Sequence, residues 1–421
     1  MSRLAFLISR LRRRIWLVPA VLTMVAILSP LFAWLVGHNF ALLNEAWIGQ
    51  ETLVLVMQVL AGSMLPVATF SVMGMISAFH AISANASPRA TDLAVADPGS
   101  QFALGAFIGA FLFAVVSLIG LRAEFYRATG TAVLSVITLC IIVFVAATLV
   151  RWIDHVSKLG LMSSVIARIE RVTGNAFRAY RRLPVLPAGA TRFQSGVPVR
   201  SRGDGYVQQV DVAGIERVAS QLGATVHVLR APGDPVRIGA PVALVTGDRM
   251  PDDDATRAIA DAFAIGDSRT FESDPRFGLS VLSEIAERAL SSSVNDPGTA
   301  IAVIDVSERI LTEWLRDNPD ERASGPVDVT MPMLSPSGLL EDAFRAIARD
   351  GAGKVEIALR LQRAFANLAS QGDAPMAAAC DVQGRLAADR ARAALTLEED
   401  RTALAAAIRR PTGVDTDEAK R

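Results

Sequence analysis

The sequence predicts an α-helical membrane domain with four transmembrane helices, followed by a cytoplasmic α+β region with a small β-module and helices. Hydrophobic residues occupy 51% of the 421 positions, and the mean hydropathy is +0.36, which is too apolar for an ordinary soluble enzyme. The long apolar runs lie before residue 153, whereas the rest of the chain has a globular composition. The length allows about two or three domains.

The transmembrane domain is predicted over residues 1–152 from apolar runs of about 20 residues, the length that crosses a bilayer as a helix. These runs cover residues 15–36, 60–83, 101–121 and 131–152. The apolar run 46–59 is either an interfacial helix or an extension of the second span. The first run is longer than the apolar core of a signal peptide and no cleavage site follows it, so we expect it to be retained.

The distribution of basic residues predicts the orientation of the spans. Arginines precede the first span, the first loop has no Arg or Lys, and basic residues follow the fourth span in large number. Because loops rich in Arg and Lys stay on the cytoplasmic side, both termini are expected to be cytoplasmic. The sequence therefore predicts a multi-pass protein of the cell inner (cytoplasmic) membrane, with the lipid bilayer as its first partner.

Small residues mark the third span, where Gly105 and Gly109 are separated by one helical turn. Such spacing lets helix backbones approach closely, either within one four-helix bundle or between subunits around a pore. No Asp, Glu, Lys or Arg lies deep inside a predicted span. A coupled ion carrier usually needs such groups, so a passive pore or no transport fits better.

The loop before the third span contains two further candidate residues, Arg89 and Asp97. Asp97 precedes Pro98, and this pair is typical of a helix start, because Asp caps free amides and Pro suits the first helical position. Arg89 is expected to pair with Asp92, with Asp97 or with lipid phosphate.

The first part of the cytoplasmic region is predicted as a connection and a β-domain. Residues 153–190 form a basic helix and a Pro-rich linker, and the helix either lies on the membrane surface or leads into the next domain. Residues 191–250 form a small β-domain similar to a barrel-sandwich. Its expected elements are strands near 197–201, 205–210, 225–230 and 241–245 and a helix near 212–222. No Lys lies between 158 and 354, so a structural or assembly module is favoured over a lipoyl- or biotin-type carrier, which needs a modifiable Lys.

The remaining region is predicted to be helical. Residues 251–316 form a helical domain that contains the sequence NDPGTA, and residues 317–409 contain Ala-rich helices after a Pro-rich loop over 317–335. The tail 410–421 is expected to be disordered.

Candidate ligand-binding residues fall in two segments of the helical domain. The first, IGDSRTFESDP, contains Asp267, Arg269, Glu272 and Asp274. An Arg side chain can order several carboxylates, so this cluster is either structural or a ligand or cation site.

The second segment, SSSVNDPGTA at 291–300, contains Asn295, Asp296 and Thr299. Asp296 before Pro297 predicts a capped turn between two helices. The alternative is a polar pocket that this turn forms together with the Asp267–Asp274 cluster.

Composition argues against several function classes. The formal net charge is zero, from 42 basic and 42 acidic residues, so no general attraction to nucleic acid is implied. Cys140 and Cys380 lie in different parts of the chain, and His155 and His227 have no nucleophile or metal-ligand pattern beside them. We therefore expect no catalytic residues, no metal site and no cofactor, and we expect that the protein is not an enzyme.

The layout resembles a family of bacterial predicted integral membrane proteins of unknown function. The resemblance covers about residues 15–315. It is carried by SPR at 87–89, Q-x-x-LG-x-F at 101–107, GYV at 205–207, IG-x-x-RT at 265–270, DPRFG at 274–278 and ERALSSSVNDPGTA at 287–300. Members more often read ALSPA-x-NDP-x-TA, and here Ser292 replaces the Pro. The resemblance implies a membrane protein with a cytoplasmic domain and no established activity.

Three functions follow as hypotheses. The first is an oligomeric pore or channel-like protein, expected to be a homo-oligomer, whose domain order resembles small-conductance mechanosensitive channels at the level of architecture. The second is a membrane-anchored scaffold or ligand-binding protein, with an unknown small-molecule or protein ligand. The third, which ranks below both, is a membrane-surface enzyme that uses Asp267, Glu272, Asp274 or Asp296.

Overall fold

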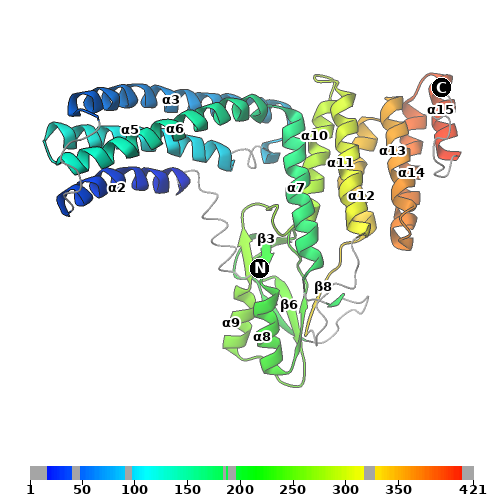
Figure 1. The fold of residues 1–421 in the computed structure, drawn as a ribbon. Helices are drawn as coiled ribbons and strands as arrows, with labels where there is room; N and C mark the ends of the chain where they lie inside the picture. Colours follow the sequence, from blue (N-terminus) through cyan, green and yellow to red (C-terminus); the bar gives the residue numbers. More distant parts are fainter. Residues whose placement is uncertain are drawn as a thin grey trace. The chain divides into compact units, whose positions relative to one another are not determined.

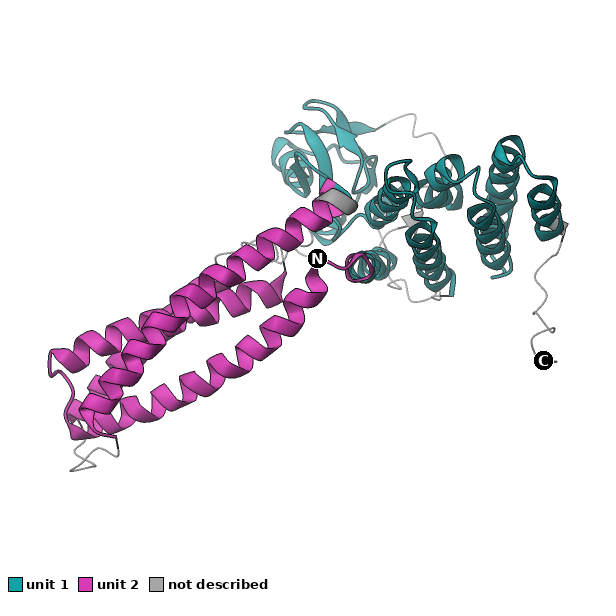
Figure 2. Ribbon diagram, turned by 90° about the horizontal axis from the view of Figure 1, so that it is seen from above, with its two compact units in different colours: residues 1–6, 85–87, 166–421 teal, residues 7–84, 88–165 magenta. Residues whose placement is uncertain are grey.

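The structure, a computed structural model, describes residues 17–39, 48–90, 97–183, 186–187, 196–316 and 328–409. The chain divides into two compact units, which Figure 2 distinguishes by colour. One unit holds residues 7–84 and 88–165, and the other holds residues 1–6, 85–87 and 166–421. The expected tail 410–421 lies outside the described residues.

Four helices of the first unit are long and apolar enough to cross a membrane. They are α2 (Leu17–Asn39), α3 (Gln50–Asn85), α5 (Pro98–Arg122) and α6 (Ala128–Leu159), and they run side by side in Figure 1. The predicted class of a four-helix membrane domain is thereby confirmed. Residues 50–59 belong to α3, so this part of the apolar run is an extension of the second span.

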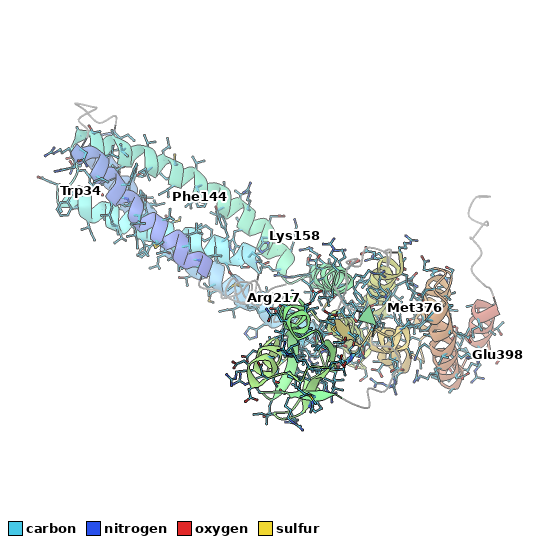
Figure 3. The ribbon with its side chains drawn as sticks, turned by 90° about the horizontal axis from the view of Figure 1, so that it is seen from below. Trp34, Phe144, Lys158, Arg217, Met376 and Glu398 are labelled. Carbon is cyan, nitrogen blue, oxygen red and sulfur yellow. The ribbon has the colours of Figure 1, made fainter. Side chains whose placement is uncertain are left out.

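The bundle is filled by large side chains from α3, α5 and α6. Phe107, Phe113 and Leu134 have no exposed surface. The outward faces are apolar as well, because Phe70 is 79% exposed and Val150 is 69% exposed. The side chains project all around the helices in Figure 3, where Trp34 and Phe144 are labelled. Exposed apolar surface on this scale suits a lipid environment.

The connecting region differs from its expected limits. Helix α6 continues without a break past residue 152 to Leu159, and the next helix, α7 (Met162–Arg181), is amphipathic. The apolar face of α7 is covered by protein, since Ile169 is 0% exposed and Phe177 is 3% exposed. The apolar face of α7 therefore packs within its own unit, and both predicted roles of this helix, lying on the membrane surface or leading into the next domain, stay predictions.

The β-region contains the elements expected from the alternating pattern. They are β2 (Val197–Arg200), β3 (Gly205–Val210), α8 (Val212–Leu222), β4 (Thr225–Val228) and β6 (Pro241–Thr246). A short strand β5 (Pro235–Val236) and the helix α9 (Asp253–Asp261) complete this part of the chain.

The strands form two sheets rather than one module confined to 191–250. One sheet has the order β1-β8-β4-β6-β2, and the other has the order β5-β3-β7. Strands β1 (Leu186–Pro187), β7 (Phe263–Gly266) and β8 (Val329–Met331) come from outside the expected domain. The interpretation of 317–335 as a loop is wrong at β8, which pairs in parallel with β1 and β4. Three residues are too few for a period-two pattern to be recognised.

The remaining helices form an array of hairpins in two layers, which are seen end-on in Figure 2. Helices α10 (Pro275–Leu290), α12 (Pro336–Asp350) and α14 (Ala374–Ala394) stack in one layer, because α12 packs against both of the others. Helix α13 (Val355–Ala369) packs against α11 (Pro297–Arg316) and α15 (Glu398–Arg409) in the other. Fully buried Leu282, Ile304 and Leu361 lie in its core.

Candidate functional site

Helix α10 joins the two segments that the sequence singled out. The first segment runs from strand β7 through a turn into the start of α10, and the second forms the turn between α10 and α11. The candidate residues therefore lie at the two ends of one helix. Each end is built by an Asp-Pro pair, Asp274-Pro275 and Asp296-Pro297.

Asp274 closes the N-terminal end of α10, and its side chain is only 2% exposed. Its Oδ1 atom accepts a hydrogen bond of 3.2 Å from the backbone N–H of Phe277, which confirms the predicted cap. Its Oδ2 atom accepts one of 2.7 Å from Nε of Arg269. The Arg269 guanidinium lies 5.0 Å from the centroid of the Phe277 ring, within range of a cation–π interaction.

A glycine from the β-region allows this close arrangement. Gly233 has φ +95°, and a Cβ atom at that position would overlap the Asp274 carboxylate. Only glycine combines that backbone angle with the required space. Burial raises the pKa of Asp274 above its ordinary value, while the hydrogen bonds from Arg269 and Phe277 act in the opposite direction.

The other members of the first cluster are placed differently. Asp267 is exposed, and Glu272 is partly buried. Gln208 from β3 holds the turn by donating a hydrogen bond of 2.8 Å to the backbone oxygen of Ser268. Arg269 and Asp274 thus form the ion pair at the centre of this turn. The observed contacts of both residues are with the protein itself, as expected for a structural role.

Asn295 has a conformational role at the other end of α10. Its φ is +52°, in the left-handed region that Asn tolerates better than other residues with a Cβ atom. The turn is closed by backbone hydrogen bonds, from Asn295 N to Ser291 O and from Asp296 N to Ala289 O, each 2.8 Å long. The Asn295 side chain accepts a hydrogen bond from Nζ of Lys354, which precedes α13.

Asp296 caps α11 together with Thr299. Oδ1 accepts a hydrogen bond of 3.1 Å from the Thr299 backbone N–H, and Oδ2 accepts one of 2.6 Å from the Thr299 hydroxyl. These hydrogen bonds lower the pKa of Asp296 below its ordinary value. The predicted capped turn is confirmed.

The two motif segments do not share a pocket. Helix α10 has 16 residues and separates them. At a rise of about 1.5 Å per residue, its ends lie about 24 Å apart. The predicted polar pocket formed by Asn295 with the Asp267–Asp274 cluster is therefore wrong. The segments are close in sequence, but an unbroken helix keeps them apart.

An open, highly charged cavity of about 400 Å³ lies along α10, α12 and α14. Helix α10 contributes Ser280, Ser283, Glu284 and Glu287, which recur at helical spacing on one face. Helix α12 contributes acidic and basic side chains, and α14 contributes Arg390. Sequence reasoning missed this site, because the only local signal was a polar stripe on α10 that also suits a solvated face.

The glycines of the third span pack within the chain. A Cβ atom on Gly105 would approach the backbone of Pro19 to 2.7 Å, and one on Gly109 would lie 3.4 Å from Ala26 Cβ. Both contacts are with α2, the helix that packs most closely on α5. This is the close helix packing that small residues allow.

Asp97 caps α5 as predicted and also contacts α6. Its Oδ2 atom accepts hydrogen bonds from the backbone N–H and the hydroxyl of Ser100, at 2.7 and 2.8 Å. The same atom lies 2.6 Å from Nε2 of His155, a contact that the sequence did not indicate. Arg89 is exposed, and Asp92, one of its predicted partners, lies outside the described residues.

Within the described residues, no group of three or more His, Cys, Asp or Glu side chains is arranged to hold a metal ion.

Residues 12–367 match the family described as "Predicted membrane protein (DUF2254)". The chain belongs to this family. The match includes the spans, the β-region and the helices α10 to α12, and it ends inside α13. Helix α14, which supplies Arg390 to the charged cavity, lies beyond the part of the chain that matches DUF2254.

The chain is also similar to two uncharacterized mycobacterial proteins. These are Rv1290c of Mycobacterium tuberculosis and Mb1321c of Mycobacterium bovis, each 36% identical over 112 residues. The aligned part covers 26% of this chain and 22% of the relatives' own length. No solved structure matches this chain.

Proposed function

We propose that the protein is a membrane-anchored binding protein, in which the layer formed by α10, α12 and α14 receives a ligand. The observation that carries this proposal is the charged cavity of about 400 Å³ in that layer. Ligand sites are commonly concave and lie between packed helices. Arrays of helical hairpins commonly bind partners along the exposed side of one layer.

The observed contacts of the carboxylates favour binding over catalysis. Asp274 and Asp296 were candidate acids or bases, and both accept the hydrogen bonds that start a helix. A carboxylate engaged in this way is poorly placed to exchange protons with a substrate. We therefore assign these two carboxylates no catalytic role.

The distribution of basic residues gives the cavity an expected side of the membrane. Arginines before the first span and basic residues after the fourth favour cytoplasmic termini in the inner membrane. The cavity would then face the cytoplasm.

The oligomeric pore is the competing hypothesis. Within one chain, the bundle is filled by Phe107, Phe113 and Leu134, each with no exposed surface. A pore would therefore have to lie between several copies of the chain. Gly105 and Gly109 offer it little support, because their close contacts are with α2 of the same chain.

The proposal is tested by closing the cavity. Ala346 lines it, and Ala346→Trp places a large side chain there. Ala378→Trp, at an exposed position of α14, is the matched control. Full-length proteins purified in nanodiscs are extracted for mass spectrometry of retained small molecules and screened by thermal shift against a metabolite library.

The expected result is a retained or stabilising compound that the wild type and Ala378→Trp share and that Ala346→Trp loses. Identical behaviour of all three proteins in both assays would show that the cavity does not bind a ligand. Tension-gated currents from an oligomer in liposomes would instead support the pore.

A further inference from the structure

Two ion-pair groups lie along the cavity, one on each side of Arg345. On one side, Arg276 donates to both carboxylate oxygens of Asp342, at 2.6 and 3.2 Å. On the other side, Arg349 lies 3.4 Å from Glu287 and also pairs with Asp350. The charged side chains in these pairs already have partners within the protein. A ligand is therefore expected between the pairs.

Two arginines of the cavity have no such partners. Arg345 of α12 and Arg390 of α14 both line the cavity, and neither makes a hydrogen bond or an ion pair within the described part of the chain. A guanidinium presents planar donors that match a carboxylate or a phosphate. Two guanidinium groups from neighbouring helices on one cavity therefore favour an anionic group.

Ser283 supplies a second, independent observation. It lines the same cavity, the residue is only 3% exposed, and its hydroxyl has no hydrogen-bond partner in the described structure. A buried hydroxyl without a partner is unfavourable, and most such groups in proteins are satisfied. A ligand oxygen would provide the missing partner.

The carboxylates of the cavity determine what else the ligand carries. Glu284 and Glu341 line it beside Arg345 and Arg390. A ligand with only an anionic group would meet two carboxylates as well as two arginines, and the repulsion would offset much of the attraction. A ligand that also carries an ammonium group would complement both signs.

We infer that the cavity binds a small zwitterion that carries a carboxylate or phosphate group and an ammonium group. The anionic group lies against Arg345, Arg390 and Ser283, and the ammonium group lies against Glu284 and Glu341. This inference rests on the proposed function, since it names the ligand class of the same cavity.

Isothermal titration of the full-length protein in nanodiscs tests the inference with probes that differ in charge. The carboxylate probes are 4-aminobutanoate, butanoate and butylamine, which share one carbon chain. Phosphoethanolamine and inorganic phosphate test the phosphate alternative. We expect one of the two zwitterions to bind with a Kd at least about tenfold below those of the probes that carry only one of its two charged groups, because each charged group adds interactions of its own.

Variants identify the residues. Arg345→Gln and Arg390→Gln should each weaken binding of that zwitterion by about tenfold or more, whereas the exposed Arg363→Gln on α13 should not. Ser283→Ala should weaken binding without lowering the melting temperature of the free protein, since the hydroxyl has no partner to lose. A residue with a purely structural role would lower that temperature.

Two results would overturn the inference. Probes with only one charged group that bind as tightly as the zwitterions would show that the ligand class is wrong. No binding by any probe, while Ala346→Trp still loses a retained compound, would disprove the zwitterion but leave the proposed function intact. If Ala346→Trp also behaves as wild type, the proposed function itself fails.

Discussion

The two ends of α10 use the same sequence device in very different surroundings. At each end an Asp precedes a Pro and accepts the backbone N–H three residues later. The Asp274 side chain is 2% exposed and pairs with Arg269, whereas Asp296 is exposed and pairs with Thr299 of its own helix. A cap is recognisable from local sequence, but its contribution to stability depends on what packs over it.

The largest effect is expected at the buried cap. Asp274→Ala removes a helix cap and leaves Arg269 without its partner, so it should lower the free energy of unfolding by about 2–4 kcal/mol. Denaturant titration of the full-length protein in detergent measures the loss. Asp254→Ala is the control, since that carboxylate is 90% exposed in its pair with Arg257.

A loss for Asp274→Ala no larger than that of Asp254→Ala would contradict the buried role. Asp274→Asn refines the test, because the amide oxygen can still accept from Phe277 while the charge is removed. We expect its loss to lie between those of the wild type and Asp274→Ala.

Glycine substitutions near the two Asp-Pro pairs should show the same order, with the larger loss of stability at the start of α10. A Cβ atom on Gly278 would overlap the side chain of Thr173 in α7, whereas one on Gly298 would meet only Asp296 Oδ1, at 3.3 Å. Gly278→Ala should therefore cost about 1–3 kcal/mol through overpacking. Gly298→Ala should be neutral or slightly stabilising, because Ala favours a helix.

Melting temperatures of the two glycine variants, measured side by side, check this difference. Equal losses would mean that the start of α10 is not packed against α7 as tightly as the structure indicates.

Local chemistry explains what could be predicted from the sequence. The spans follow from hydropathy, the caps from Asp-Pro pairs, and β2, β3, β4 and β6 from alternating patterns between turns. The cavity could not be predicted in this way. The residues that line it, such as Ser283, Arg345 and Arg390, come from separate helices and meet only after α10, α12 and α14 have stacked. The contact of Asp97 with His155 escaped for the same reason, since 58 positions separate the two residues.

A smaller effect is expected at the exposed cap. Asp296→Ala should cost about 1 kcal/mol at neutral pH, a common value for losing a cap. Because the folded pKa of Asp296 is lowered, its contribution is present at neutral pH and is lost as the pH falls below the ordinary carboxyl value of 3.8. The difference in free energy of unfolding between the variant and the wild type, measured by denaturant titration, should therefore narrow in acid. A difference that does not change with pH would contradict an ionised cap.

The smallest change in stability is expected at Asn295, where variants distinguish a role in backbone conformation from a role in ligand binding. Its φ of +52° favours glycine or Asn, so Asn295→Gly should retain stability while Asn295→Ala loses up to about 1 kcal/mol. Thermal unfolding of both variants measures this order. Their binding of the zwitterion preferred by the wild type should be unchanged, because Asn295 lies at the end of α10 and does not line the charged cavity. If Asn295→Gly kept its stability but lost that binding, the ligand would extend to this turn, and the turn would be more than a structural connection.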